Sequence, residues 1–269
     1  METLNINKKY PLTEISNDEI IALAPAAGAA KPHPAVSDRY SFVSTMQAVN
    51  FLRDAGWVPV AAKQNTTQTS EAHGLHLVQF SRKDLDLGDK RLMLNLYNSH
   101  NRTSVFYLIG ALLRLICGNG MVSSNNKLSF RHRHMGFDAE KFIESARFVA
   151  QGINVLGHQA GEWETIDLEP DEKGAFAYAA HQLLYDSLDD APILPGKLLE
   201  PRRDEDRKDD LWTTMNVVQE NIIRGEISGK AKTGRKLTTR PVKALDRDKR
   251  LNQALWTLTE KMAEIKRAA

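Results

Sequence analysis

The sequence predicts an α+β protein: an antiparallel sheet meander with covering helices, plus a helical C-terminal part. Two observations carry this prediction. Between residues 57 and 134, short segments rich in β-branched and aromatic residues alternate with polar turns. Residues 138–158 and 246–267 instead repeat their apolar side chains at helical spacing. Strands followed by helices that cover one face are typical of an α+β arrangement.

The composition is that of a globular protein. Of the 269 residues, 42% are hydrophobic and 26% charged, and the formal net charge of +2 is too small to indicate a polyanionic partner by itself. The single cysteine, Cys117, excludes an intrachain disulfide and is typical of a reducing compartment. No apolar run reaches the roughly 18 residues of a membrane span, and the N-terminus lacks a signal-peptide core. We therefore expect a cytoplasmic protein with no membrane partner.

The chain is predicted to begin with an arm and a helix. Residues 25–40 are rich in alanine, proline and glycine, which disfavour regular structure, so residues 1–40 are expected to form an N-terminal arm. Ser44 followed by Gln47 is a helix-capping pattern, and Gly56 stands where that helix should end.

The strands of the meander follow. The predicted strands are residues 57–62, 74–81, 91–97, 104–117 and 127–134. The segment 104–117 is nearly continuous in apolar residues, so its periodicity fits a strand or a helix. Its β-branched and aromatic residues favour a strand, which we expect to break near Gly110.

Two polar turns flank this central segment, at residues 98–102 and 118–120. Their side chains can hydrogen-bond to nearby backbone, and glycine readily takes positive φ. We expect both turns to lie at one end of the sheet, with Gly120 at positive φ, and to shape one functional surface. The residues of this candidate surface are Asn98, Ser99, His100, Arg102, Asn119 and Gly120.

The second half of the chain is predicted to be mainly helical. Further helices are expected at residues 171–187 and 211–225. Residues 189–210 contain prolines and many charges of both signs, so a linker or mobile insertion is predicted there. The expected organisation is an arm, an α+β core, a charged linker and a helical C-terminal region with a basic loop, at residues 1–40, 41–188, 189–210 and 211–269.

The C-terminal helix carries an apolar stripe at four-three spacing. The stripe consists of Leu251, Leu255, Leu258, Met262 and Ile265. Such a stripe suits packing at a shallow angle against another helix. We favour the helix of residues 211–222 as its partner, because packing within one chain loses no translational freedom. The alternative partner is the same helix of a second subunit, and Trp256 lies off the stripe in either case.

A basic loop is the strongest functional signal. In residues 225–243, lysines and arginines alternate with glycine and threonine, and there is a single glutamate. Flexible cations of this kind can follow a phosphate backbone, although a solvated loop with no partner fits as well. The candidate nucleic-acid-binding residues are Lys230, Lys232, Arg235, Lys236, Arg240 and Lys243, with a second group at Arg131 and Arg133.

Other chemistries have less support in the sequence. The phosphate-loop spacing that nucleotide hydrolysis needs does not occur. Cys117 and the histidines lack the spacing of metal sites, so no metal or cofactor is expected. No catalytic constellation stands out, and we expect that the protein is not an enzyme.

Aromatic residues of the predicted strands offer a second route to nucleic acid. An exposed ring on a sheet can stack an unpaired base, although core packing is the better interpretation for each ring. The residues concerned are Trp57, Tyr97, Phe106, Tyr107 and Phe130. A meander backed by a helix, with a basic edge, is also similar in layout to the single-strand annealing proteins of phages.

Three stretches carry a resemblance to a known family. They are NSHNRTS with LRLICGNGMV (within residues 98–122), LWTTMNVVQENIIRGE (residues 211–226) and LNQALWTL (residues 251–258). They resemble the phage- and plasmid-like family of uncharacterised proteins called domain of unknown function 932. The resemblance spans most of the chain and implies a mobile genetic element, without implying a chemistry.

The leading hypothesis is a nucleic-acid-binding protein of a phage or plasmid, acting on single-stranded DNA in recombination or replication. The alternative is a protein-binding inhibitor of a host defence or restriction system. A third possibility is an enzyme that uses Asn98 and His100 beside the turn at Gly118. Homo-oligomers are possible under each hypothesis.

Overall fold

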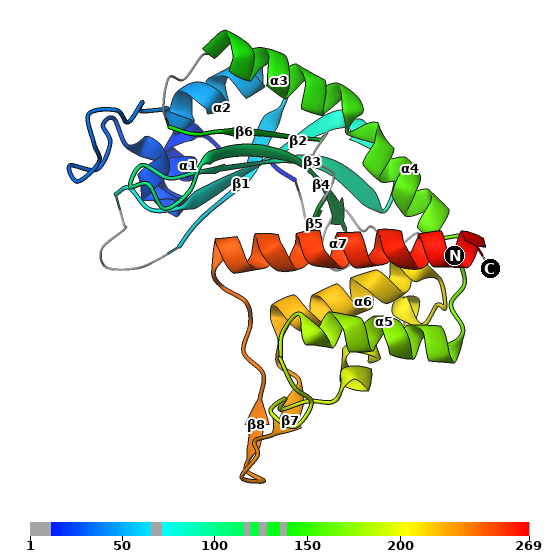
Figure 1. Cartoon of the computed structure of the whole chain (residues 1–269). Coiled ribbons are helices and arrows are strands. Elements are labelled where there is room, and N and C mark those ends of the chain that lie inside the picture. Colours follow the sequence, from blue (N-terminus) through cyan, green and yellow to red (C-terminus); the bar gives the residue numbers. More distant parts are fainter. Residues whose placement is uncertain (1–11, 66–71, 116–118, 124–127, 135–138, 269) are drawn as a thin grey trace. The chain divides into compact units, whose positions relative to one another are not determined.

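The computed structural model describes residues 12–65, 72–115, 119–123, 128–134 and 139–268. The chain divides into two compact units, Met1–Gly157 (unit 1) and His158–Ala269 (unit 2). Unit 1 holds a large sheet and its covering helices, and unit 2 is mainly helical (Figure 1). The predicted α+β class is confirmed. The division itself differs from the predicted one, because the boundary precedes residues 189–210.

An antiparallel meander forms the centre of unit 1. Strands β1 (Val58–Gln64), β2 (His76–Asp86), β3 (Lys90–Asn98) and β4 (Phe106–Arg114) pair in sequence order. The register places Leu96 opposite both Val78 and Leu108, and all three side chains are fully buried. The pairing confirms the predicted meander, while β3 is buried along nearly its whole length, on both faces of the sheet.

Strand β4 carries two short strands on its outer edge. β5 (Asn119–Val122) pairs with the second half of β4, and β6 (Ser129–His132) pairs with the first half. β4 continues through Gly110, so the predicted break is wrong. The absent side chain instead makes room for a helix, since a Cβ atom at Gly110 would lie 3.3 Å from Leu156 Cδ1 and 3.4 Å from Ile153 Cγ1.

Helix α2 (Thr45–Asp54) covers one face of the sheet (Figure 1). The Ser44 hydroxyl accepts a hydrogen bond from the backbone N–H of Gln47 at 3.3 Å, and Gly56 follows the helix at a φ of 84°. The helix predicted from these two signals is confirmed.

Helix α3 (Ala139–Gly152) lies on the same face (Figure 1), and α4 (Asn154–Trp163) follows it across the boundary between the two units. They replace the single helix predicted for residues 138–158. Helix α3 ends at Gly152. A Cβ atom at Gly152 would lie 2.6 Å from Leu128 Cδ2. A glycine lowers helix propensity, and the close packing of Leu128 accounts for its presence.

The N-terminal segment is packed, so the prediction of an arm is wrong for its described part. Helix α1 (Asn17–Leu23) begins with a reciprocal capping box between Ser16 and Glu19, and the short helix η2 (Pro25–Gly28) follows. Ile20 and the alanines at 24, 26 and 27 are fully buried. Alanine-rich composition suggested an arm, but small side chains also let a backbone approach a core closely.

The core of unit 2 is built from α5 (Pro170–Gln182), α6 (Leu211–Arg224) and α7 (Leu245–Ala268). Helices α6 and α7 pack against each other, and the Gln219 side-chain amide donates to Asn252 Oδ1 at 2.8 Å. The predicted pairing of these two helices within one chain is confirmed.

The buried face of α7 is rotated from the predicted stripe. The first two stripe leucines are buried and the next two residues are half-buried, but Ile265 is 62% exposed. Trp256 is fully buried instead, with its ring centroid 4.8 Å from that of Trp163. An indole removes more apolar surface from water than an isoleucine side chain does, so the tryptophan pair favours this rotation.

Residues 189–210 form a packed part of unit 2 rather than the predicted linker. They include the short helices η4 (Pro195–Leu199) and η5 (Asp204–Asp206). The Asn221 side chain of α6 donates hydrogen bonds to two carbonyl oxygens of this segment, at 3.0 and 2.9 Å. The Arg203 guanidinium reaches both carboxylate oxygens of Glu220, at 2.6 and 2.8 Å. The charges that suggested a solvated linker are thus partly buried in specific pairs.

Candidate functional site

The Asn98–His100 turn lies in the interior of unit 1, so its prediction as a surface is wrong. Asn98, Ser99 and His100 are all 0% exposed. Residues 33–43 cover this turn: the His33 backbone N–H donates to the His100 carbonyl at 2.9 Å, and the Tyr40 hydroxyl donates to the Ser99 carbonyl at 3.0 Å. Most of the hydrogen-bonding capacity read from the sequence is used inside the protein, by Asn98 and Ser99 in particular, whereas Nδ1 of the buried His100 makes no hydrogen bond of good geometry among the described residues.

A buried polar cluster of Thr45, His76, Asn98, His100 and His134 surrounds this turn. The Asn98 amide donates to Thr45 Oγ1 at 2.9 Å, and the Thr45 oxygen lies 2.8 Å from His76 Nε2. His76 Nδ1 lies 2.9 Å from the Gly74 carbonyl, which can only accept. His76 is therefore neutral with its proton on Nδ1, and the Thr45 hydroxyl donates to Nε2.

Burial keeps the histidines of this cluster uncharged. It lowers the pKa of His76 to about 4 and that of His100 to about 3. It also lowers the pKa of His134 to about 4, although the backbone of Ser41 and Ser104 raises that pKa slightly. Neighbouring histidines lower the pKa of His100 further, because two positive charges would repel each other.

The two polar turns lie at opposite ends of β4, which contradicts the prediction of one shared surface. Asn98 ends β3 near the start of β4, whereas Asn119 pairs with Arg114 at its end. The strand between them is continuous, and an extended strand of this kind separates its ends by roughly 25–30 Å. Gly120 is not among the residues at positive φ, so that expectation is also wrong, while the exposed Arg102 does have a φ of 69°.

The basic loop folds into a hairpin that extends from unit 2 (Figure 1). Its strands are β7 (Ser228–Lys230) and β8 (Lys236–Thr238). All six predicted cations are exposed, and they are Lys230, Lys232, Arg235, Lys236, Arg240 and Lys243.

The two faces of the hairpin differ. Gly229 and Leu237 are paired on the inner face, where a Cβ atom at Gly229 would lie 2.1 Å from the Pro192 carbonyl oxygen. Lys230 and Lys236 are paired directly opposite each other on the outer face. The backbone N–H of Lys230 donates to the Pro192 carbonyl at 2.8 Å, which anchors the hairpin. Its outer face is therefore held toward solvent.

Three of the predicted cations, Lys232, Arg131 and Arg133, are less well placed to contact a phosphate together with the outer face of the hairpin. Lys232 forms an ion pair with Asp190, which offsets part of its charge. Arg131 of β6 lies over the Tyr107 ring, with its guanidinium carbon 4.5 Å from the ring centroid. Arg131 and the exposed Arg133 belong to unit 1, whereas the hairpin belongs to unit 2.

The aromatic residues of the strands are core residues. Trp57, Tyr97, Phe106 and Tyr107 are at most 2% exposed, and Phe130 is half-buried. The interpretation as core is confirmed for the four buried rings, which are not available to stack a base.

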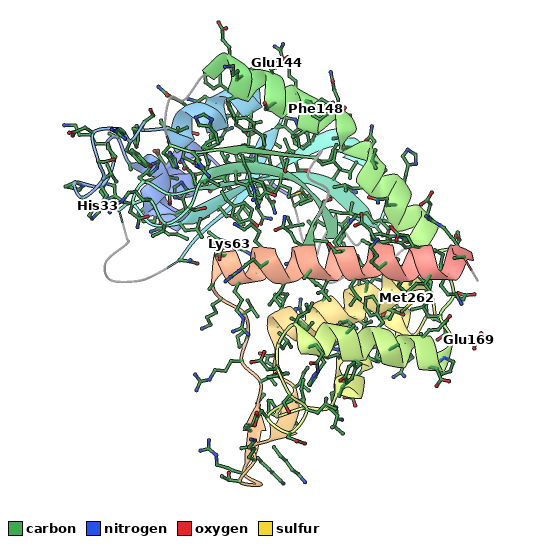
Figure 2. All side chains as sticks on the ribbon, in the orientation of Figure 1. His33, Lys63, Glu144, Phe148, Glu169 and Met262 are labelled. Atoms are coloured by element: carbon green, nitrogen blue, oxygen red, sulfur yellow. The ribbon has the colours of Figure 1, made fainter. Side chains whose placement is uncertain are left out.

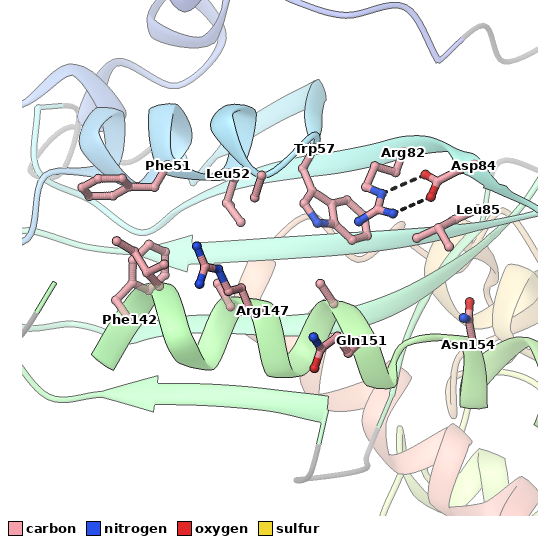
Figure 3. A pocket seen from close by; sticks show the side chains of 14 residues that line it. Phe51, Leu52, Trp57, Arg82, Asp84, Leu85, Phe142, Arg147, Gln151 and Asn154 are labelled. Carbon is pink, nitrogen blue, oxygen red and sulfur yellow. Dashed lines mark hydrogen bonds and ion pairs between the residues drawn. The ribbon is translucent and has the colours of Figure 1, made fainter. Parts of the chain in front are cut away.

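A cavity of about 460 Å³ lies in unit 1 between α2, α3 and the region of β2 (Figure 3). Phe51 and Leu52 come from α2, Phe142 from α3, and Trp57 from just before β1. These apolar walls are interrupted by the side chains of Arg82, Asp84, Arg147, Gln151 and Asn154 (Figure 3).

Sequence reasoning missed this cavity completely. Its walls come from residues about a hundred positions apart, and each wall taken alone looks like an ordinary amphipathic face. No local signal marks it, because Arg147, like Glu144, is an exposed charged residue between the buried Phe142 and Val149 on α3.

The described part of the chain contains neither a cluster of metal-ligating side chains nor a helix that could span a membrane. Among these residues no group of three or more histidine, cysteine, aspartate or glutamate side chains could hold a metal ion. Cys117 lies outside the described residues. No described helix has both the length and the apolar character needed to cross a bilayer.

Comparison with known proteins identifies the family. Residues 32–256 match the family described as "Domain of unknown function (DUF932)". The chain belongs to the DUF932 family. The resemblance seen in the three sequence stretches is therefore confirmed, and the matched region of this DUF932 protein includes both the hairpin and the cavity.

Two similar proteins from Escherichia coli (strain K12) extend this comparison. The UPF0380 protein YafZ is 30% identical over 257 residues, and the UPF0380 protein YfjQ is 29% identical over 257 residues. Each alignment covers 95% of this DUF932 chain and 93% of its relative. No solved structure matches the chain.

Proposed function

We propose that this protein binds nucleic acid, with the outer face of the β7–β8 hairpin contacting the phosphate backbone. The observation that supports this most is the direct opposition of Lys230 and Lys236. Like charges directly opposite each other on a hairpin destabilise it. A bound phosphate would relieve that repulsion, and exposed Arg235 and Arg240 could contact neighbouring phosphates.

The hairpin is suited to phosphates rather than to bases. Residues 227–243 contain no aromatic side chain that could stack a base and no asparagine or glutamine that could read one. We therefore propose binding without sequence preference. Single-stranded DNA is the form we propose, since a flexible strand can follow a short row of cations. A role in recombination or replication of a mobile element rests on the family resemblance alone.

The test is a salt titration of oligonucleotide binding. Labelled oligothymidylate is titrated with the wild-type protein and with the Lys230→Ala, Arg235→Ala, Lys236→Ala triple variant, and anisotropy is measured at several salt concentrations. Each lost phosphate contact should reduce the salt slope by about 0.7 for a single strand, so the slope should fall by about 2. A duplex of the same length gives the preference between the two forms.

A matched control keeps the net charge equal. The Lys197→Ala, Arg207→Ala, Lys261→Ala triple variant removes three exposed cations of unit 2 that already have carboxylate partners. Its affinity and salt slope should stay close to wild type. Equal losses in both triple variants, or no loss in the hairpin variant, would overturn the proposal. If the wild type binds no oligonucleotide at low salt, the alternative of a protein partner takes its place.

A further inference from the structure

The cavity of unit 1 has the dimensions and lining of a ligand site. Its volume of about 460 Å³ falls in the range of sites for small organic molecules, roughly 300–1,000 Å³. The rings of Trp57 and Phe142 are at most 1% exposed, so packing beneath the cavity holds them in place. Phe51, which is 37% exposed, forms part of the rim. A preformed apolar hollow with a few polar groups is typical of ligand sites.

One of the two arginines at this cavity already has a carboxylate partner. Arg82 Nε donates to Asp84 Oδ1 at 2.8 Å, and a second hydrogen bond joins the other oxygen of the same carboxylate (Figure 3). The guanidinium also lies over the Trp57 ring, 5.5 Å from its centroid. Arg82 and Asp84 therefore contribute no net charge to the cavity.

The second arginine supplies an uncompensated positive charge. Arg147 extends from α3 toward the space between α3 and α2 (Figure 3). Within the described part of the chain its guanidinium makes no hydrogen bond and no ion pair. Arg147 is an exposed residue of the cavity lining, so its guanidinium is free to form charge-assisted hydrogen bonds with the acid group of a bound molecule.

We propose that this cavity binds a small organic anion, specifically a carboxylic acid with an apolar aromatic or aliphatic body. The apolar body lies against Phe51, Leu85 and Ile143, and the acid group pairs with Arg147. The side-chain amides of Gln151 and Asn154 supply further donors at the same wall. The proposed nucleic-acid contact does not involve these residues, so the two proposals can fail separately.

Two fluorescent probes separate the apolar and the anionic parts of this site. Anilinonaphthalene sulfonate carries the ring system and one negative charge, and phenylnaphthylamine carries the same ring system without the charge. Both are titrated into the full chain, and the dissociation constants are obtained from fluorescence. The wild type should bind both probes, and it should bind the anion more tightly.

Two substitutions in the site test the two parts. Arg147→Ala should weaken the sulfonate by about tenfold, as expected for loss of one charge-assisted hydrogen bond, and should leave the neutral probe within about twofold. Arg147→Lys should recover much of the loss, because it restores the charge. Ala150→Trp fills the cavity from α3 and should weaken both probes by at least about tenfold.

Two substitutions on the outer side of the same helix serve as controls. Glu144 and Phe148 point away from the sheet (Figure 2), and Phe148 is 60% exposed. Phe148→Ala and Glu144→Gln should change neither dissociation constant, and near-ultraviolet circular dichroism should show that every variant is folded. Probe binding that follows Phe148 instead of Ala150 would mean that the probes bind the exposed helix surface, and the proposal would be wrong. Equal effects of Arg147→Ala on both probes would remove the anionic part of it.

Discussion

The hydroxyl of Thr45 lies 2.8 Å from Nε2 of His76 and joins the first residue of α2 to the first residue of β2. The same oxygen accepts a hydrogen bond from Asn98 at 2.9 Å, and all three residues are 0% exposed. A helix and two strands are therefore held together by one hydroxyl group in the interior of unit 1.

Thr45→Val should destabilise the protein by about 1–3 kcal/mol, because it leaves buried polar groups of His76 and Asn98 without their partner. The measurement is urea unfolding at pH 7.5. Thr45→Ser keeps the hydroxyl and should cost less. If valine and serine cost the same, the hydroxyl group does not contribute to stability in the way described.

Acid should destabilise unit 1 well above the pH at which carboxylates titrate. Burial lowers the pKa values of His76, His100 and His134 to about 4, 3 and 4, from 6.5 in the unfolded chain. As pH falls from about 6.5 to about 4, the unfolded state takes up protons that the folded state does not. The free energy of unfolding should then fall by up to about 1.4 kcal/mol per pH unit for each histidine.

His134→Phe tests this pH dependence. The ring of His134 stacks on that of Tyr40 with centroids 4.7 Å apart, and its nitrogens lie near the backbone of Ser41 and Ser104 without a hydrogen bond of good geometry. Phenylalanine can keep that stacking, so stability at pH 7.5 should be unchanged or higher. The decline below pH 6.5 should become about one third shallower. An unchanged decline would show that His134 does not contribute to it.

Gly229→Ala should detach the hairpin from Pro192. The added Cβ atom would lie 2.1 Å from the Pro192 carbonyl oxygen, a backbone atom that cannot move aside easily. Hydrogen exchange of the Lys230 amide, which donates to the same oxygen, should accelerate. Gly196→Ala is the matched control, since a Cβ atom there has no neighbour within 4 Å. Equal protection of Lys230 in both variants would contradict the described anchor.

Glu220→Gln should destabilise the protein by about 1–3 kcal/mol, because it removes the charge from a buried hydrogen-bonded carboxylate, although Arg203 keeps Asp206 as a partner at 2.6 Å. Glu220 is 2% exposed and bonds Arg203 with both carboxylate oxygens, at 2.6 and 2.8 Å. Glu200→Gln breaks an exposed ion pair with Lys197 and should cost less than about 1 kcal/mol. Thermal unfolding of the two variants provides the comparison, and similar costs would refute the distinction.

Local patterns in the sequence predicted local structure well. The strand at β3 and the caps at Ser44 and Gly56 depend on neighbouring residues, and the structure has each of them as expected. Burial could not be predicted in the same way. The turn at His100 has a polar surface composition, and it is interior because residues 33–43, far away in sequence, cover it.

The two candidate sites show the same difference between features that depend on neighbouring residues and features that depend on residues far apart in sequence. The cations of the hairpin are exposed because burying a charged side chain is unfavourable, so the sequence alone was enough to predict their exposure. The cavity beside Arg147 depends on how far α2 and α3 stand apart on the sheet, which no local pattern contains. The same limit applies to Trp256, whose burial depends on Trp163 in another helix.

The edges of the sheet have a consequence for the behaviour of this protein in solution. β5 and β6 together cover the outer edge of β4. At the other edge, β1 contains a proline and a register irregularity between Pro59 and Ala61, and the Ile15 backbone N–H bonds to the Pro59 carbonyl at 2.9 Å. Within the described residues, neither edge presents a long, regular row of free backbone groups on which another chain could add a strand. Concentrated samples should therefore resist the ordered aggregation that exposed sheet edges promote.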